Sequence, residues 1–267
     1  MTQHSEIGRI VRQIEWWDLA RMTVWDGLVE CTLPLPWLAA SWYCAARGWW
    51  IPALGCSFIF FLVALRLNHE AIHHNLGLGA RGHHRVMHAL SFVMIGSNHS
   101  VAWNHLRHHR YLDTPQDLEG KAGRMRFWQV LAYGPRFPVE CHWATLTEAG
   151  PAWRRRVMVD LALNLAMAGL AVGLRLDFLM YHLAVMAAAH SLTALFAVWI
   201  THRPGADHAM VARTQRNPMV NFVSYNMFFH LEHHLFPGVP VRRLPELARR
   251  LDAAAPWVAG NAGRVLG

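Results

Sequence analysis

The stretch VMVDLALNLAMAGLAVGLRLDFLMYHLAVMAAAHSLTALFAVWI, residues 157–200, contains two apolar runs separated by Arg175 to Asp177. The runs extend from Val157 to Leu174 and from Phe178 to Ile200, close to the roughly 20 residues that a helix needs to cross a bilayer. Because three residues allow only a tight turn, this pattern predicts two antiparallel transmembrane helices, a helical hairpin.

A second hairpin is predicted nearer the N-terminus. Apolar runs extend from Leu33 to Ala46 and from Trp49 to Leu67, and the connection at Arg47 is again very short. The first run is the shorter of the two, and it contains Pro34 and Pro36. We therefore predict an all-α integral membrane protein in which four transmembrane helices form two hairpins, with residues 1–267 as a single domain.

The arginines predict the orientation of these helices. The chain has a net charge of +8, but no basic face interleaved with stacking aromatic residues is visible, so we expect no nucleic-acid partner. Many of the arginines fall between the two hairpins: Arg81, Arg85, Arg107, Arg110, Arg124, Arg126, Arg136 and Arg154 to Arg156. By the positive-inside rule this segment and both termini are cytoplasmic, and we expect a bacterial inner membrane.

The stretch Val86 to Trp103 is apolar but is interrupted by Gly96, Ser97, Asn98 and His99. This pattern favours a helix at the interface or a partial re-entrant segment. A fifth crossing is the alternative, and it would place the histidines on either side of this stretch on opposite faces of the membrane.

Three histidine clusters are the main chemical signal: HEAIHH at residues 69–74, HLRHH at residues 105–109 and HLEHH at residues 230–234. In the last cluster, a helical rotation of about 100° per residue places the three imidazoles in one narrow sector. One such cluster would fit a surface turn equally well. A further histidine, His202, directly follows the last apolar run. The predicted topology brings all four groups to the cytoplasmic face, as a helical cap that holds a metal site.

The number of imidazoles indicates two metals, because one zinc ion takes only three or four ligands. The candidate ligands are His69, His73, His105, His108, His109, His202, His230, His233 and His234. His74 is rotated off the face shared by His69 and His73, so its role stays open. Carboxylates that could fix the imidazole tautomers are Glu70, Asp113, Asp117 and Glu232.

Ligand type alone does not name the metal, since imidazole binds zinc, iron, copper and nickel. HEAIH also matches the HExxH signature of zinc metalloproteases, in which Glu70 would be the general base. A membrane protease, however, needs only one further ligand and leaves the other two clusters and His202 unexplained. A metal-binding or transport protein without enzymatic activity would place its ligands inside the crossings.

The chain resembles the membrane fatty acid desaturases and their relatives, the alkane hydroxylases and carotenoid oxygenases. The resemblance covers roughly Phe58 to Leu251 and is strongest in HEAIHH, NHLRHHRYLDTPQD and FFHLEHHLFPGVPVRRLPEL. It implies two iron ions that activate O2 and remove hydrogen from an unactivated C–H bond. Zinc could replace iron in a purified sample.

The resemblance also implies a role for His202, because members have an isolated histidine just after the last crossing. Stearoyl-type desaturases have an asparagine four residues before it, where this chain has Val198, so the nine-histidine pattern of the alkane hydroxylases is closer here. Because HHLFPGVPVRRLPEL is similar to the desaturase branch, we expect desaturation of a fatty acyl chain from a membrane lipid or acyl substrate. The alternative is a hydroxylase or ketolase acting on an alkane, acyl chain or carotenoid.

An external electron donor is implied as a partner, namely a ferredoxin, a rubredoxin or a cytochrome with its reductase. The other histidines are not expected to be ligands. We expect exposed or interfacial positions for His83, His84, His88, His99, His142 and His208, and hydrogen-bonded positions inside the bundle for His182 and His190.

Overall fold

The computed structural model describes residues 3–112, 114–203, 210–262 and 264–265. These residues form helices and connecting loops without a strand, apart from an isolated bridge between Thr214 and Arg264. Asp113, a predicted partner of an imidazole, and His208, expected to be exposed or interfacial, lie outside the described residues.

Up to residue 148, the described residues form α1 (Gln3–Gln13), α2 (Val24–Thr32), α3 (Leu35–Ala46), α4 (Trp50–Ile72), α5 (Ala80–Met94), α6 (Asn98–Tyr111), α7 (Gly120–Gly123), α8 (Phe127–Tyr133) and α9 (Arg136–Glu148). The C-terminal half contains α10 (Pro151–Gly173), α11 (Asp177–His190), the π-helix η1 (Ala194–Trp199), α12 (Ile200–His202), α13 (Pro218–Val223), α14 (His230–Leu235), the 3₁₀ helix η2 (Val241–Arg243), α15 (Leu244–Ala254) and α16 (Pro256–Ala262).

Three helices within the described residues are long and apolar enough to cross a membrane. They are α4, α10 and the continuous helix Asp177–His202, which comprises α11, η1 and α12. The fourth expected crossing is α3, which has 12 residues and is not among the three. At 1.5 Å per residue, a helix of that length spans about 18 Å, well short of the hydrocarbon core. The fourth crossing therefore stays a prediction.

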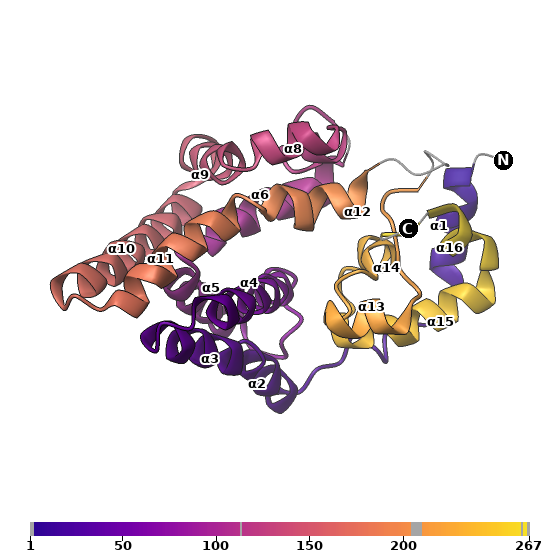
Figure 1. The fold of residues 1–267 in the computed structure, drawn as a ribbon. Helices are drawn as coiled ribbons and strands as arrows, with labels where there is room; N and C mark the ends of the chain where they lie inside the picture. Colours follow the sequence, from indigo (N-terminus) through magenta and orange to yellow (C-terminus); the bar gives the residue numbers. More distant parts are fainter. Residues whose placement is uncertain (1–2, 113, 204–209, 263, 266–267) are drawn as a thin grey trace.

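The long helices pack into one bundle. α3 packs against α4 and α11, while α10 lies beside α11 and is joined to it by a short turn at Leu174 to Leu176 (Figure 1). α5 packs against α4 and α10, and α6 packs against α9 and α10. Apolar side chains from α3, α4, α5 and α6 form a shared core, with Phe60, Leu76, Met87 and Met94 among its fully buried members.

The stretch that was expected to be interrupted consists of two helices, α5 and α6, with a break at residues 95–97. Ile95 has a left-handed backbone at φ 58°, which ends α5. The carbonyls at the end of a helix have no partner within it, and an apolar bundle supplies no water for them. His182 donates from Nε2 to the carbonyl of Val93 at 2.6 Å, and His190 donates to that of Met94 at 2.8 Å. The expectation of hydrogen-bonded bundle histidines is confirmed.

The start of α6 is held by Asp160 from α10. Its Oδ2 accepts hydrogen bonds from Ser97 Oγ at 2.6 Å and from the backbone N–H of His99 at 3.2 Å. The Nδ1 atoms of His88 and His99 lie 2.6 and 2.9 Å from the same carboxylate, and His142 Nε2 accepts from the backbone N–H of Ser97 at 3.0 Å. Side chains from three neighbouring helices thus provide hydrogen-bond partners for the backbone groups at the break between α5 and α6.

This arrangement corrects the expectation of exposure for two histidines. His83 and His99 are both fully buried, so the prediction that they are interfacial or exposed is wrong. His99 is buried because its ring bonds Asp160 inside the bundle, and His83 because its Nδ1 pairs with the carbonyl of Gly79 at 3.1 Å. His84, His88 and His142 are half-buried.

At one end of the bundle the C-terminal helices pack with α1 into a separate apolar core (Figure 1). Ile10 of α1 and Ile14, just after it, pack in one cluster with Leu231 of α14 and Leu244 and Leu247 of α15. This core holds α14 beside the ends of the bundle helices, and α1 and α16 lie at this same end (Figure 1).

Candidate metal centre

The predicted ligands lie at the ends of α4, α6 and α12 and in the short helix α14. His69 lies in the last turn of α4, and His73 is the residue that caps it. The second cluster is in the last turns of α6, His202 is the last residue of α12, and the third cluster forms the short helix α14. All nine candidate imidazoles meet at the bundle end, and their Nε2 atoms face one another in two groups.

The first group contains five rings: His69, His73, His105, His109 and His233. Nε2 of His233 lies 2.9 Å from Nε2 of His69 and 3.0 Å from that of His109. Nε2 of His105 lies 3.1 Å from those of His73 and of His109. Three separate segments of the chain therefore direct their ring nitrogens at one point.

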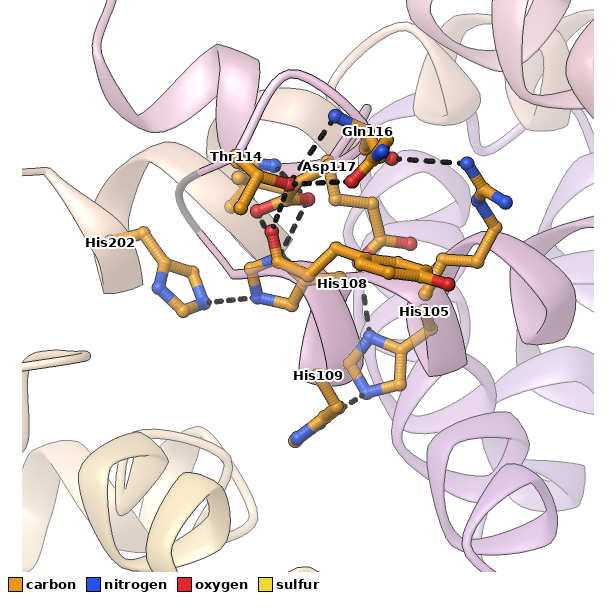
Figure 2. A network of polar contacts seen from close by, with 12 residues as sticks. His105, His108, His109, Thr114, Gln116, Asp117 and His202 are labelled. Carbon is orange, nitrogen blue, oxygen red and sulfur yellow. Dashed lines mark hydrogen bonds and ion pairs between the residues drawn. The ribbon is translucent and has the colours of Figure 1, made fainter.

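The second group contains four rings: His108, His202, His230 and His234. Nε2 of His202 lies 3.1 Å from that of His108, 2.8 Å from that of His230 and 3.2 Å from that of His234. Figure 2 shows His202 and His108 facing each other while His109, one residue further along α6, turns toward His105. Neighbouring residues of HLRHH thus belong to different groups.

Each ring also has an Nδ1 atom on the side away from the converging Nε2 atoms. The hydrogen bonds of these Nδ1 atoms indicate whether the Nε2 atoms can bind a metal. His108 Nδ1 lies 2.9 Å from both carboxylate oxygens of Asp117, and His202 Nδ1 lies 3.1 Å from the carbonyl oxygen of Val211. A carboxylate and a carbonyl only accept, so both Nδ1 atoms carry the proton and both neutral rings present a lone pair at Nε2. Two lone pairs 3.1 Å apart repel unless a cation lies between them. The donor set fits a metal.

Burial keeps most of these rings in the form that binds metal. It lowers the pKa of His73, His105, His230, His233 and His234 well below the usual value, and neighbouring imidazoles lower it further. For the same reasons the pKa of His109 falls to about 2. Neutral imidazole is the ligand form of histidine, so protons compete little for these nitrogens at neutral pH.

Asp117 takes the role expected of it, because it bonds the ring of His108. The loop after α6 brings it there: Asp117 Oδ1 accepts from the backbone N–H of Gly120 at 2.8 Å, at the start of α7. A Cβ on Gly120 would lie 2.1 Å from Asp117 Oδ2, and one on Gly123 would lie 3.1 Å from His202 Cβ. Glycine at these two positions lets α7 approach both residues.

Glu119 is a site residue that the sequence reasoning missed. Its Oε2 lies 3.0 Å from Nδ1 of His105, and burial raises its pKa to about 7. The acidic residue that follows Asp117 by two positions was a possible signal. The direction of the Glu119 side chain, however, depends on how the loop after α6 folds.

The other expected carboxylates act elsewhere. Glu232 is fully buried and bonds Thr214 at 2.7 Å and Arg216 at 2.6 Å rather than an imidazole. Glu70 accepts from the backbone N–H of Val241 at 3.1 Å and lies 3.8 Å from Nδ1 of His69, on the ring edge away from the converging Nε2 atoms. A general base must face the metal-bound water, so this position speaks against the protease alternative.

His74 lies apart from both groups. It is exposed, has a left-handed backbone at φ 60°, and its ring neighbours that of His83. The turn that ends α4 thus directs it away from the other histidines of HEAIHH.

An apolar cavity opens beside the two groups. Its walls include His69, His105, His230 and His233 together with Leu65, Ile72, Val101, Phe137, Phe196, Ala197 and Val198. A second apolar pocket shares Leu65, Phe196, Ala197, Met227 and Phe228 with it and continues to α13. Phe222 and Val223 of α13 are strongly exposed. An apolar path therefore leads from the imidazoles toward an apolar surface.

A model of the fatty acid desaturase family matches residues 47–260. The chain belongs to this family. The matched segment contains every residue of the two imidazole groups, and the predicted resemblance to the membrane desaturase and hydroxylase superfamily is confirmed. That residues 1–267 form a single domain stays a prediction.

Two characterised relatives are similar over most of the chain. A beta-carotene ketolase of Paracoccus sp. is 25% identical over 257 residues, which cover 88% of this chain and 97% of the ketolase. A sphingolipid delta(4)-desaturase of Drosophila melanogaster is 28% identical over 226 residues, which cover 76% of this chain and 66% of that desaturase. A membrane oxidoreductase of the desaturase and hydroxylase type accounts for both relationships. The assignment of the nine histidines as ligands stays a prediction.

Proposed function

We propose that the protein desaturates a fatty acyl chain, using O2, electrons from outside and two iron ions held by the nine histidines. The observation that carries this proposal is the pair of converging imidazole groups, whose Nε2 atoms are placed as the ligands of two metal ions would be. Family membership supports the reaction class.

The residues of this chain would hold and orient the irons. His69, His73, His105, His109 and His233 would hold one ion, and His108, His202, His230 and His234 the other. Glu119 and Asp117 would fix the rings of His105 and His108 through their Nδ1 protons. When bound, the two irons would supply O2 activation and hydrogen removal from a C–H bond.

The cavity would hold the acyl chain. Leu65, Val101 and Phe196 line it beside His69 and His105, so they would place methylene groups against the imidazole groups and exclude water. The exposed apolar face of α13 would lie at the membrane, where a lipid chain can enter without crossing water.

We extend the proposal to topology and partners. Four crossings, with α3 as the short one, would form two hairpins in a bacterial inner membrane, and the arginine-rich segment between them would be cytoplasmic. The bundle end that carries the histidines and the C-terminal helices would form the cytoplasmic cap. A ferredoxin, rubredoxin or cytochrome with its reductase would deliver electrons there.

A ketolase or hydroxylase is the second candidate function. The observation in its favour is the ketolase of Paracoccus sp., whose similarity extends over 97% of its own length. The same imidazole groups would serve either reaction, so the structure of the centre does not discriminate between them.

The test is product analysis with labelled oxygen. The iron-loaded protein, given O2, a reducing system and saturated acyl lipids, should form a cis alkene without incorporating label from 18O2. A labelled alcohol or ketone would assign the protein to the hydroxylase or ketolase class. One zinc per chain with no iron-dependent activity would refute the two-iron proposal, and peptide cleavage without O2 would revive the protease.

A further inference from the structure

A buried carboxylate lies among the ligands of the third histidine cluster. Glu232 stands between His230 and His233 on α14, and it is fully buried. A carboxylate inside a protein is costly unless hydrogen-bond donors and an opposite charge compensate it. The position of α14 therefore depends on the groups that pair with Glu232.

Arg216, in the segment before α13, provides the opposite charge. Its Nη2 donates to Oε1 of Glu232 at 2.6 Å, and its Nη1 donates to Oγ1 of Thr214 at 2.7 Å. The Thr214 hydroxyl in turn donates to Oε2 of Glu232 at 2.7 Å. Both carboxylate oxygens of Glu232 thus have a donor, and Arg216 contacts one of them directly and the other through Thr214.

The same guanidinium also connects α14 to α15. Nε and Nη2 of Arg216 donate to the two carboxylate oxygens of Asp252 on α15, at 2.8 and 2.9 Å. Two parallel hydrogen bonds of this kind fix the orientation of a guanidinium. α14 has only six residues, too few for a helix that is stable without contacts to the rest of the molecule. The oriented guanidinium is one of the contacts that α14 needs.

From these contacts we infer that Arg216 is a positioning residue of the metal centre. By compensating Glu232, it holds α14 where its three imidazoles meet those of α4, α6 and α12. Arg216 acts through Glu232 and does not itself contact the imidazole groups. This inference rests on the proposed function, because it takes the two imidazole groups as two metal sites.

α14 contributes unequally to the two groups. His230 and His234 are two of the four rings in the second group, whereas His233 is one of the five rings in the first. A displacement of α14 would leave two predicted ligands in the second group and four in the first. Loss of Arg216 should therefore weaken metal binding in the second group more than in the first.

Arg216→Met should displace α14 because it leaves a buried charge without its counter-ion. Among the described residues, the Thr214 hydroxyl is then the remaining side-chain donor to Glu232. Removing one member of a buried ion pair is more disruptive than replacing both, since the remaining charge must become hydrated. Hydration of Glu232 requires water to enter beside α14 or the helix to move outward, and either change separates its imidazoles from the others.

The test measures metal binding with zinc, which imidazole binds without O2 or electrons. Zinc is titrated into metal-free protein in detergent against a chromophoric chelator, and the wild type should bind two ions per chain. His202→Ala shows which of the two affinities belongs to the second group. Arg216→Met should weaken that affinity by roughly 10–100-fold and leave the affinity of the first group within about threefold.

A double variant separates positioning from a general loss of stability. Arg216→Met combined with Glu232→Gln removes the charge together with its partner, so the affinity of the second group should return to within about threefold of wild type. If Arg216→Met does not fold, Arg216→Lys takes its place. Lysine keeps the charge but not the planar fork that contacts both carboxylates, so it should give a smaller loss of affinity.

Arg250→Met is the matched control. The Arg250 side chain is 28% exposed, close to the 32% of Arg216, and it also pairs with two carboxylates, those of Asp18 and Glu246. Both of these partners reach solvent, because their side chains are 61% and 34% exposed. Their charges remain hydrated when Arg250 is removed, so both zinc affinities should stay within about twofold of wild type.

The inference is overturned if Arg216→Met and Arg216→Lys bind both ions as the wild type does, or if both groups lose affinity equally. A double variant that does not recover the second affinity also overturns it. These outcomes leave the proposed function intact as long as the wild type binds two ions. A wild type that binds fewer than two ions refutes the two-metal centre of the proposed function, and with it the role of Arg216.

Discussion

At the scale of single residues, the centre depends on which edge of each imidazole is occupied. Asp117, Glu119 and the carbonyl of Val211 each pair with an Nδ1 atom, which leaves the Nε2 lone pairs of three rings free to bind a metal. Each partner would therefore control the affinity for a metal without itself touching the metal.

His202 gives the first prediction, because it belongs to no cluster in the sequence yet contacts three rings of the second group. His202→Ala should lower the iron content by about one ion per chain and abolish turnover. His74→Ala, in the first cluster but exposed, should leave both unchanged. Metal analysis and product yield at matched expression provide the check, and equal tolerance of the two changes contradicts the nine-ligand assignment.

Glu119 gives the second prediction. Glu119→Ala removes the partner of His105 Nδ1, frees the ring to rotate and should weaken metal binding by roughly 10–100-fold. Titration with a competing chelator measures this affinity. Glu148→Ala changes a carboxylate on the exposed end of α9 and should have no effect; a Glu119 variant with wild-type affinity would show that the contact does not orient the ring.

At the scale of helices, the break between α5 and α6 explains the positions of several histidines outside the centre. His182 and His190 bond the last carbonyls of α5, and His142 bonds the first N–H at the start of α6. These residues allow an interrupted helix to exist in an apolar bundle, and α6 then carries His105, His108 and His109 to the centre.

Asp160 gives a prediction at this scale. It accepts hydrogen bonds at the start of α6 and pairs with two imidazoles while fully buried. Asp160→Ala should lower the free energy of unfolding by about 3 kcal/mol or more, because several buried donors lose their partner. Thermal unfolding in detergent measures the change.

The control for Asp160 is Asp177→Ala at the exposed start of α11, which should cost no more than about 0.5 kcal/mol. If the two variants melt alike, Asp160 does not hold the break. The metal content of the folded Asp160→Ala fraction should also fall, since α6 carries three of the nine predicted ligands.

At the scale of the whole molecule, the imidazole groups link folding, metal and pH. In the folded, metal-free chain burial lowers the pKa of His73, His105, His109, His230, His233 and His234. In the unfolded chain these rings take up protons below about pH 6.5. The unfolded state then binds more protons, so stability falls as the pH drops through that value.

We therefore expect the metal-free protein in detergent to lose about 1.4 kcal/mol per pH unit for each such ring below pH 6.5. Glu119 opposes this in part, because its pKa of about 7 lets the folded chain hold one proton that the unfolded chain releases above about pH 4.5. Unfolding midpoints measured across this range, with and without metal, test the expectation. A metal-free protein that is equally stable at pH 5 and pH 7 would contradict it.

The sequence alone predicted the helical class, the long apolar helices and the nine histidines, because these are local properties. Apolar length defines α4, α10 and the helix Asp177–His202, and short spacings place several imidazoles on one face of a helix. The family was recognisable for the same reason, since its motifs are short contiguous segments.

The tertiary structure decided what depends on contacts between distant segments. It separated His108 from His109 into different groups, brought Glu119 to His105 and buried His83 and His99, which had been expected to be exposed. No local pattern encodes these outcomes, because the direction of a side chain at a helix end or in a loop is set by the elements that pack around it.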